Sequence, residues 1–250
     1  MRHKTHQSLL ALSAVLMLSA CAGFSNNAGE IADPLEDINR TTLKINDAVD
    51  KVVLEPVARG YRAVTPGGIR TAVSNFLTNL QSPIVIGNQL LQGDLEGAGN
   101  ATARMVINTL AGFGGILDLA DQGGIEHEPE DFGQTLATWG VGDGMYVVLP
   151  LMGPSSLRDA TGMMIDGYVD PLRLYLFNVE DEHWHYIRTG ATVVSQREQL
   201  LDIVDDLRRN SFDYYAALRS AYYQNRQSLI RDEKAKGSGA GADIPDYDDF

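Results

Sequence analysis

The sequence predicts an all-α protein with one helical domain. Apolar residues recur at spacings of three and four along most of the chain, which is the pattern of helices with one buried face. No alternation of apolar and polar residues persists long enough for a sheet, and residues 145–149 are expected as one short strand at most. A length of 250 residues is ample to bury a core.

The first helix is expected to begin at Asp33, which is placed to cap it. Pro34 then takes the first helical position, and Glu36 follows three residues after the cap. The pair Glu55-Pro56 is expected to end this helix, because a residue that precedes proline is disfavoured in the helical conformation. Its apolar stripe comprises Ile38, Thr42, Ile45, Val49 and Val52.

The next helices are interrupted in the prediction by a proline. A helix with an apolar stripe that includes Ile69 and Val73 is expected to end at Ser82-Pro83, where a third helix begins. Residues 94–110 predict another helix. At its start Gly93, Gly97 and Ala101 are four apart, a spacing of small residues that lets helices approach closely.

The C-terminal half predicts one helix that begins near Ser156, where Ser156 and Asp159 act as caps, and that runs to about Asp166. Residues 185–208 and 212–235 then predict two long helices.

Ser211 is the expected N-cap of the last of these helices. Tyr215 and Tyr222 lie on one stripe of that helix. Core packing is favoured for both, and an aromatic belt at a membrane interface is the alternative.

The N-terminus has the layout of a secretory signal peptide. Basic residues precede an apolar stretch, residues 9–18, that is too short to span a membrane and ends in small residues. The sequence Leu18-Ser19-Ala20-Cys21 resembles the bacterial lipobox, in which the cysteine becomes the first mature residue and carries acyl chains. An ordinary signal with an incidental thiol is the alternative. Lipid attachment at Cys21 is favoured, because the single cysteine of the chain directly follows the small residues that a cleavage site needs.

The expected organisation follows from this signal. Residues 1–20 form the lipoprotein signal peptide, residues 21–32 an acylated tether, residues 33–236 the helical domain and residues 237–250 an acidic disordered tail. Ala22 stands where an aspartate commonly retains lipoproteins at the inner membrane, so the outer membrane is the expected location.

Charge excludes one class of partner. Formal net charge is −13 for the whole chain and −15 after residue 20, where 18 basic and 33 acidic residues remain. Such a chain is a poor candidate for binding nucleic acid, whose phosphates demand a basic surface.

The charges are unevenly distributed. Between residues 71 and 157 the only basic residue is Arg104, and residues 71–93 carry no charge. This uncharged segment contains polar residues such as Asn75 and Gln81, so it is not expected to be a simple membrane span. The middle third is therefore expected either to lie partly in lipid without crossing it or to form the core of a soluble domain, and the lipid anchor favours membrane contact.

No motif predicts catalysis. Asp131-Phe132-Gly133 spells a kinase tripeptide without its companion motifs, and residues 140–144 lack the third glycine of a dinucleotide site and are expected to form a flexible turn. His127 lies among carboxylates, where a metal site is conceivable, but a solvated acidic loop is favoured because HExxH spacing is absent. His183 and His185 point to different sides of a helix. We expect no enzyme activity, no cofactor and no metal.

Several motifs together resemble the MlaA (VacJ) family of outer-membrane lipoproteins over about residues 21–230. They are Asp33-Pro34-Leu35-Glu36 with Asn39-Arg40, Ser74-Asn75-Phe76, Leu91-Gln92-Gly93-Asp94, Phe132-Gly133-Gln134-Thr135-Leu136, Trp139-Gly140-Val141-Gly142, and Leu149-Pro150 through Gly153 to Leu157-Arg158-Asp159. The motifs follow the family's order, and Lys44 with Asp47 departs from its pattern.

The resemblance implies an α-helical ring in the inner leaflet of the outer membrane that encloses an amphipathic channel. Family members work beside a trimeric porin, remove phospholipids misplaced in the outer leaflet and pass them to a soluble periplasmic carrier for retrograde transport. A structural outer-membrane lipoprotein and a periplasmic lipid hydrolase are the alternative functions.

The residues expected at the channel or in contact with lipid follow from this implied architecture. Part of residues 71–117 is expected to supply the membrane-facing shell, and residues 132–156 a mobile element at the channel, with a rigid packed loop as the alternative. A charge at Val148 is expected to impair lipid clearance and to leave the folded protein abundant. The candidate residues are Phe76, Ile84, Leu90, Phe113, Trp139, Tyr146, Val148 and Leu149.

Overall fold

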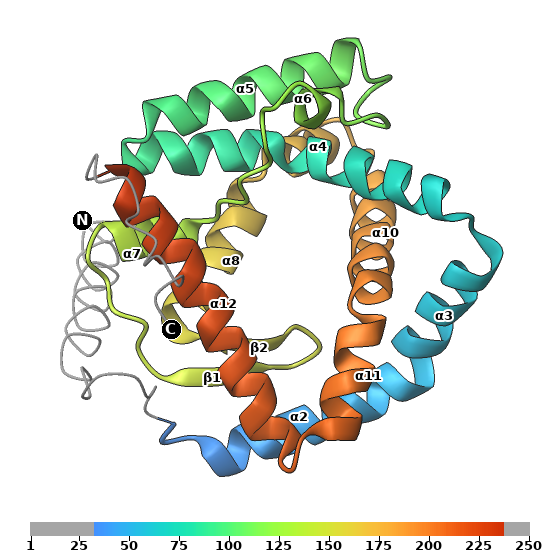
Figure 1. The fold of residues 1–250 in the computed structure, drawn as a ribbon, viewed down its shortest axis with the longest axis vertical. Helices are drawn as coiled ribbons and strands as arrows, with labels where there is room; N and C mark the ends of the chain where they lie inside the picture. Colours follow the sequence, from blue (N-terminus) through green and yellow to red (C-terminus); the bar gives the residue numbers. More distant parts are fainter. Residues whose placement is uncertain (1–32, 238–250) are drawn as a thin grey trace, which may run out of the picture.

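In the computed structural model the helices follow one another around a ring with a central opening (Figure 1). The structure describes residues 33–237, with side chains through residue 231, so the expected signal peptide, Cys21 and nearly all of the tail lie outside the described residues. In chain order the elements are α2 (Glu36–Val49), the π-helical turn η1 (Asp50–Leu54), α3 (Glu55–Val64), α4 (Gly67–Gln92), α5 (Leu95–Leu110), α6 (Leu119–Gln122), α7 (Phe132–Thr138), β1 (Tyr146–Leu149), β2 (Gly153–Ser156), α8 (Leu157–Val169), α9 (Pro171–Asn178), α10 (Glu182–Gln199), α11 (Leu201–Asn210) and α12 (Tyr214–Gly237). The predicted all-α class is confirmed.

Both ends of the first helix differ from the prediction. Helix α2 begins at Glu36 without a side-chain cap, because the carboxylate of Asp33 binds Tyr215 and Arg219 of α12 and the amide of Asn39 instead. At the other end the chain continues through η1 into α3. Pro56 lies in the first turn of α3, where its missing N–H is not needed, so it does not break the run.

Pro83 also fails to end its helix. Helix α4 runs unbroken from Gly67 to Gln92 with Pro83 in its interior, contrary to the prediction of two helices. A proline inside a helix costs about 3 kcal/mol. Packing against α5, α7 and α10 outweighs this cost.

Helices α4 and α5 run side by side as one layer of the ring (Figure 1). Asp94 caps α5 by accepting from the Gly97 N–H. Of the three small residues predicted at a close approach, Gly97 and Ala101 are buried, whereas Gly93 is exposed and ends α4 with a positive φ. The single basic residue of the middle third, Arg104, is buried and donates to Asp118 at 2.6 Å. That ion pair ties the loop after α5 back onto the helix.

Strand β1 was predicted and β2 was not. The two pair antiparallel, with Tyr146 opposite Ser156 and Leu149 opposite Gly153. The outer edge of β1 is bound by two asparagines from α2 instead of by a third strand. Asn39 donates to the Tyr146 carbonyl and accepts from the Val148 N–H, at 3.0 and 2.8 Å. Asn46, two helical turns later, donates to the carbonyl of Leu149 and accepts from the N–H of Leu151, just after the strand.

The C-terminal helices differ from the prediction in two details. A break at Leu200 divides the expected helix 185–208 into α10 and α11. The cap of α12 is Asp213, whose carboxylate accepts from the N–H groups of Tyr215 and Ala216, whereas Ser211 terminates α11. The predicted Ser156 cap of α8 is confirmed, since Ser156 Oγ accepts from the Asp159 N–H.

Two sets of contacts close the ring. The core cluster joins Leu43 of α2, Tyr146 and Val148 of β1 and Tyr215 of α12, as predicted for Tyr215. One helical turn further along the chain, the carboxylates of Asp47, Asp50 and Glu55 converge on Arg208 of α11 at 2.6 to 2.8 Å. Arg197 of α10 binds Asp50 as well. The first and last helices of the described chain are therefore bound to each other, which closes the ring.

Candidate functional site

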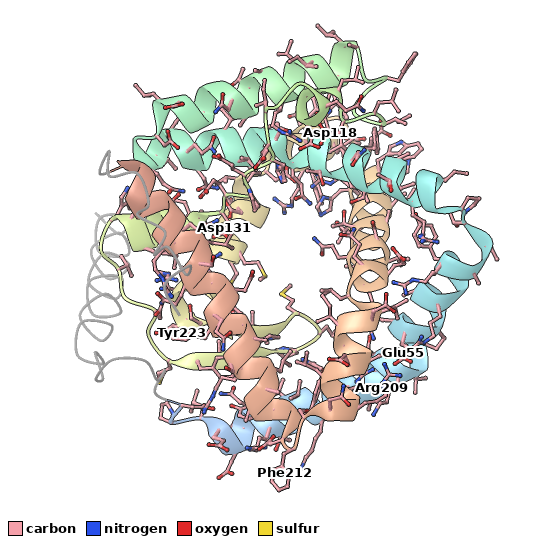
Figure 2. All side chains as sticks on the ribbon, in the orientation of Figure 1. Glu55, Asp118, Asp131, Arg209, Phe212 and Tyr223 are labelled. Atoms are coloured by element: carbon pink, nitrogen blue, oxygen red, sulfur yellow. The ribbon has the colours of Figure 1, made fainter. Side chains whose placement is uncertain are left out.

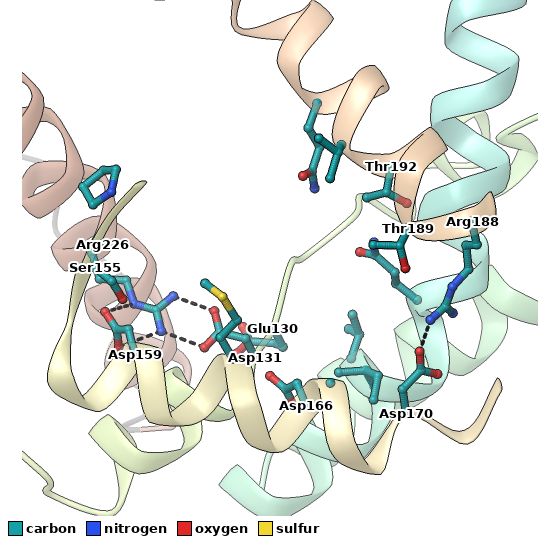
Figure 3. Close-up of a pocket in the computed structure, with 18 of the residues that line it drawn as sticks. Glu130, Asp131, Ser155, Asp159, Asp166, Asp170, Arg188, Thr189, Thr192 and Arg226 are labelled. Carbon is teal, nitrogen blue, oxygen red and sulfur yellow. Dashed lines mark hydrogen bonds and ion pairs between the residues drawn. The ribbon is translucent and has the colours of Figure 1, made fainter. Parts of the chain in front are cut away.

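A cavity of about 510 Å³ lies inside the ring. It is bounded by α4, α8, α10, α12, strand β2 and the segment before α7, so elements from both halves of the chain form its wall (Figure 3). Drawn with all side chains, the ring still has an open centre (Figure 2). The volume falls in the range of pockets that take small organic ligands.

One face of α8 lines the cavity with carboxylates. Asp159, Met163 and Asp166 follow at spacings of four and three, which places them in one stripe of the helix, and Asp170, the residue after its last turn, follows four later. Each carboxylate is bonded to a different part of the ring. Helix α8 therefore holds the wall together and gives the cavity its charge.

At one end of this stripe the guanidinium of Arg226 joins α12 to α7 and α8. It donates to both carboxylate oxygens of Asp131, at 2.6 and 2.7 Å, and to Asp159 at 3.0 Å (Figure 3). The hydroxyl of Tyr222 also donates to Asp159. Burial would raise the pKa of Asp131, but the hydrogen bonds from Arg226 outweigh it and hold the pKa below its usual value.

Two glycines allow this junction to form. A Cβ on Gly133 of α7 would lie 2.5 Å from an Arg226 nitrogen, and a Cβ on Gly162 of α8 would lie 2.3 Å from the Gly133 backbone nitrogen. The two helices cross with their backbones in contact, which only glycine at both positions permits. The Phe132-Gly133 motif is thereby explained by close packing.

In the middle of the stripe, Asp166 has neutral partners. Its oxygens accept from the Asn88 amide at 3.0 Å and from the Phe132 N–H at 2.8 Å. Asn88 in turn accepts from the Thr135 hydroxyl at 2.9 Å. Burial raises the pKa of Asp166 above its usual value. Among the described residues no lysine, arginine or histidine forms an ion pair with Asp166.

At the far end, Asp170 pairs with Arg188 of α10 and accepts from the Leu172 N–H at 3.0 Å, so it also caps α9. Arg188 lies at the cavity wall beside Thr189 and Thr192 (Figure 3).

The outside of the ring contrasts with its interior. Large aliphatic side chains with more than half of their area exposed occur on α2, η1, α3, α4 and α5. None of them lines the cavity. The most exposed of them are Val52, Val64, Leu95 and Leu110, at 74 to 81%. No helix in the described part of the chain is long and apolar enough to span a bilayer.

The candidate residues from the sequence lie in three different places. Ile84 is part of the cavity wall. Tyr146 and Val148 are buried in the core cluster, and Leu149 is half-buried beside them. The other four are exposed, and the Trp139 indole nitrogen donates to the Leu91 carbonyl at 3.0 Å. The four are Phe76, Leu90, Phe113 and Trp139.

This placement corrects one expectation. A charge at Val148, which is 6% exposed, would be buried in the core without a partner, so it is expected to destabilise the fold and would not test the cavity. The polar residues of the wall were not predicted as a site. The sequence feature that could have predicted them was the spacing of Asp159, Asp166 and Asp170. It was missed because the helix was predicted to end near Asp166.

The described residues contain no group of three or more histidine, cysteine, aspartate or glutamate side chains arranged to hold a metal ion. His127 is exposed in the loop before α7, and partial desolvation by its neighbours lowers its pKa. The turn at residues 140–144 has no helix directly after it; strand β1 follows.

The chain matches known proteins over most of its length. The family model described as MlaA lipoprotein matches residues 31–229. The intermembrane phospholipid transport system lipoprotein MlaA of Escherichia coli is 35% identical over 238 residues, 93% of this chain and 92% of the relative. Its counterpart in Haemophilus influenzae is 33% identical over 92% of this chain and 93% of the relative. An uncharacterized protein of Rickettsia prowazekii is 32% identical over 82% of this chain and 81% of the relative.

A solved structure concerned with the maintenance of bacterial outer membrane lipid asymmetry matches with a TM-score of 0.68 and 35% identity. The match covers 80% of this chain and 99% of that one.

Proposed function

This chain belongs to the MlaA lipoprotein family, and from that premise we propose that it removes mislocalised phospholipids from the outer leaflet of the outer membrane. It passes them to a periplasmic carrier for retrograde transport and so maintains lipid asymmetry. The relatives from Escherichia coli and Haemophilus influenzae are phospholipid transport lipoproteins by name.

The observation that carries the proposal is the contrast between the two faces of the ring. A phospholipid needs a polar passage for its headgroup and an apolar surface for its acyl chains. The cavity wall places aspartates, arginines and threonines beside apolar side chains such as Ile84 and Met163, and the outer helices expose aliphatic side chains. A ring with this polarity, set in one leaflet, gives the headgroup a path that avoids hydrocarbon.

Location and partners are part of the proposal. Acyl chains on Cys21 anchor the chain to the inner leaflet of the outer membrane, with the exposed aliphatic residues of α2 to α5 in lipid. A trimeric porin beside the ring and a soluble phospholipid carrier below it complete the route. Transport needs no chemistry on the lipid, so the chain acts without enzyme activity.

Deletion is the first experiment. Cells that lack the chain are expected to expose phospholipid at their surface, and the wild-type gene but not Cys21→Ser is expected to restore the normal state. Unchanged exposure in the deletion strain would refute the transport function and leave a structural lipoprotein. Release of fatty acids from bilayers by the purified protein would instead indicate a hydrolase.

Gly167 offers a direct test of the cavity. It lines the wall on α8, and a Cβ there would meet no atom within 4 Å. Gly167→Trp therefore places an indole in the passage without a clash at its Cβ, and Gly167→Ala is the matched control. We expect the tryptophan variant to fail to clear outer-leaflet phospholipid at normal abundance and the alanine variant to clear it. Clearance by both would show that lipid does not pass through this cavity.

A further inference from the structure

The cavity wall carries an excess of acidic side chains. Five carboxylates face two guanidinium groups: Glu130, Asp131, Asp159, Asp166 and Asp170 against Arg188 and Arg226. Inside a partly enclosed space such an excess repels net negative ligands and attracts cationic groups more strongly than on an open surface.

Much of this charge is already paired. Arg226 is bound by Asp131 and Asp159, and Asp159 also accepts from Arg158 and from a tyrosine hydroxyl. Asp170 is paired with Arg188. An incoming ligand would have to break these buried pairs to bind those groups, which is costly.

Asp166 forms no ion pair with a cationic side chain of the described residues. Its partners are the Asn88 amide and the Phe132 N–H, and both are neutral. Burial makes its charged form less stable than in water. A cationic group that entered the cavity would therefore gain more at Asp166 than at the three carboxylates that already have arginines.

Arg188, on the facing helix α10, has hydrogen-bond donors that no carboxylate of the described residues takes. It donates to Asp170 through one terminal nitrogen, and in the described part of the chain no acceptor takes its other N–H groups. One helical turn on, the hydroxyl of Thr192 also has no partner among the described side chains and lines the same cavity. A guanidinium with free donors beside a hydroxyl is a recognition pattern for phosphate oxygens.

We propose that the cavity selects zwitterionic phospholipids with a primary ammonium, phosphatidylethanolamine in particular, over anionic phosphatidylglycerol. Arg188 and Thr192 bind the phosphodiester, and Asp166 binds the ammonium of the same headgroup. A glycerol headgroup presents the phosphate but no cation, so it leaves Asp166 unpaired and adds a negative charge to an acidic wall. This selectivity rests on the proposed function, because it requires that lipid headgroups enter the cavity.

The test measures which lipid the acylated full chain retains. The protein is equilibrated in mixed micelles with equal amounts of phosphatidylethanolamine and phosphatidylglycerol and re-isolated, and its bound lipids are counted by native mass spectrometry. We expect the wild type to favour phosphatidylethanolamine by about five-fold, equivalent to ~1 kcal/mol at 1.4 kcal/mol per factor of ten. A wild-type ratio near one would overturn the selectivity whatever the variants do.

Two variants assign the effect. Asp166→Asn keeps the size of the side chain and removes its charge, and it is expected to bring the ratio close to one. Asp37→Asn removes the same charge from the exposed face of α2 and is expected to leave the ratio unchanged. An unchanged ratio in Asp166→Asn, or an equal loss in Asp37→Asn, would refute the role of Asp166.

A third variant separates this inference from the proposed function. Gly167→Trp is expected to abolish lipid retention, which locates the lipid in the cavity. Retention with an unchanged ratio in that variant would place the lipid elsewhere and overturn the inference, even if deletion shows that the chain maintains asymmetry. Bound lipid without selectivity, combined with loss of asymmetry on deletion, would leave the transport function intact and refute selectivity alone.

Discussion

The crossing of α7 and α8 predicts opposite effects for two glycine-to-alanine substitutions on one helix. In Gly162→Ala the new Cβ would lie 2.3 Å from the Gly133 nitrogen and 2.7 Å from its Cα. Carbon atoms in contact are normally 3.5 to 4.0 Å apart, so the helices must separate by roughly 1 Å. In Gly167→Ala the new methyl meets nothing within 4 Å.

The magnitudes follow from two opposing terms. Alanine favours a helix over glycine by about 1 kcal/mol at either position. Overpacking at Gly162 costs about 1 to 3 kcal/mol, and more here because backbone atoms form the obstacle and the shift also strains the nearby bonds of Arg226. We expect Gly162→Ala to lower the free energy of unfolding by about 2 kcal/mol and Gly167→Ala to raise it by about 1 kcal/mol.

Thermal unfolding followed by circular dichroism, with both variants in the same detergent, measures these changes. For a chain of this size 1 kcal/mol shifts Tm by about 2 to 4 °C, so the two variants should lie on opposite sides of the wild type. If Gly162→Ala were as stable as Gly167→Ala, the backbone contact between α7 and α8 would not be a constraint, and the explanation of the Phe132-Gly133 motif would be wrong.

Three other perturbations test the joints of the ring. Arg226→Met leaves Asp131 without its cation and Asp159 with Arg158 alone, and because Asp131 is partly exposed it should destabilise the protein by about 1 to 3 kcal/mol, measured by denaturant titration; a change below about 0.5 kcal/mol would mean that the junction is not structural. Asn39→Ala leaves the Tyr146 carbonyl and the Val148 N–H of β1 without their partner and should cost about 2 to 3 kcal/mol in the same assay, whereas an intact fold with unchanged protease resistance of the hairpin would contradict the role of Asn39. Wild-type stability should decrease as the pH falls below about 4, because Asp131 has a lowered pKa in the folded state and stabilises the fold only while it is ionised. Arg226→Met should lose part of this acid dependence. An identical pH profile in the wild type and the variant would show that the Asp131–Arg226 pair does not cause it.

Local sequence signals predicted the elements whose stability is local. Ser156 caps its helix as expected, because it serves an N–H group only three residues away. Asp33 and Ser211 looked equally suitable as caps. Asp33 is instead bound by side chains of α12, more than 180 residues later, and such a competitor leaves no trace in the neighbouring sequence.

The missed features depend on contacts of the same long range. The conformational preferences of proline predict a break at Pro83, but they do not include the packing of α5, α7 and α10 on α4. Strand β2 contains glycine, proline and two serines, none of which favours a strand, and it exists because β1 offers an edge. The cavity assembles from five helices or strands and one loop, so its residues share no motif, and the family resemblance alone predicted that a channel is present.

The hydrogen bond from Tyr215 to Asp33 affects the order in which the ring assembles. The contact joins residues 182 positions apart, and nothing covalent in the described chain reinforces it. Contacts of such separation form late, because the whole intervening chain must first be available. Without α12, helix α2 can still bind β1 and α11, but the cavity wall lacks Tyr222 and Arg226, the partners of Asp131 and Asp159. Docking of the last helix therefore completes the wall of the passage, and a chain truncated before α12 would keep the arc of helices and lose that side of the wall.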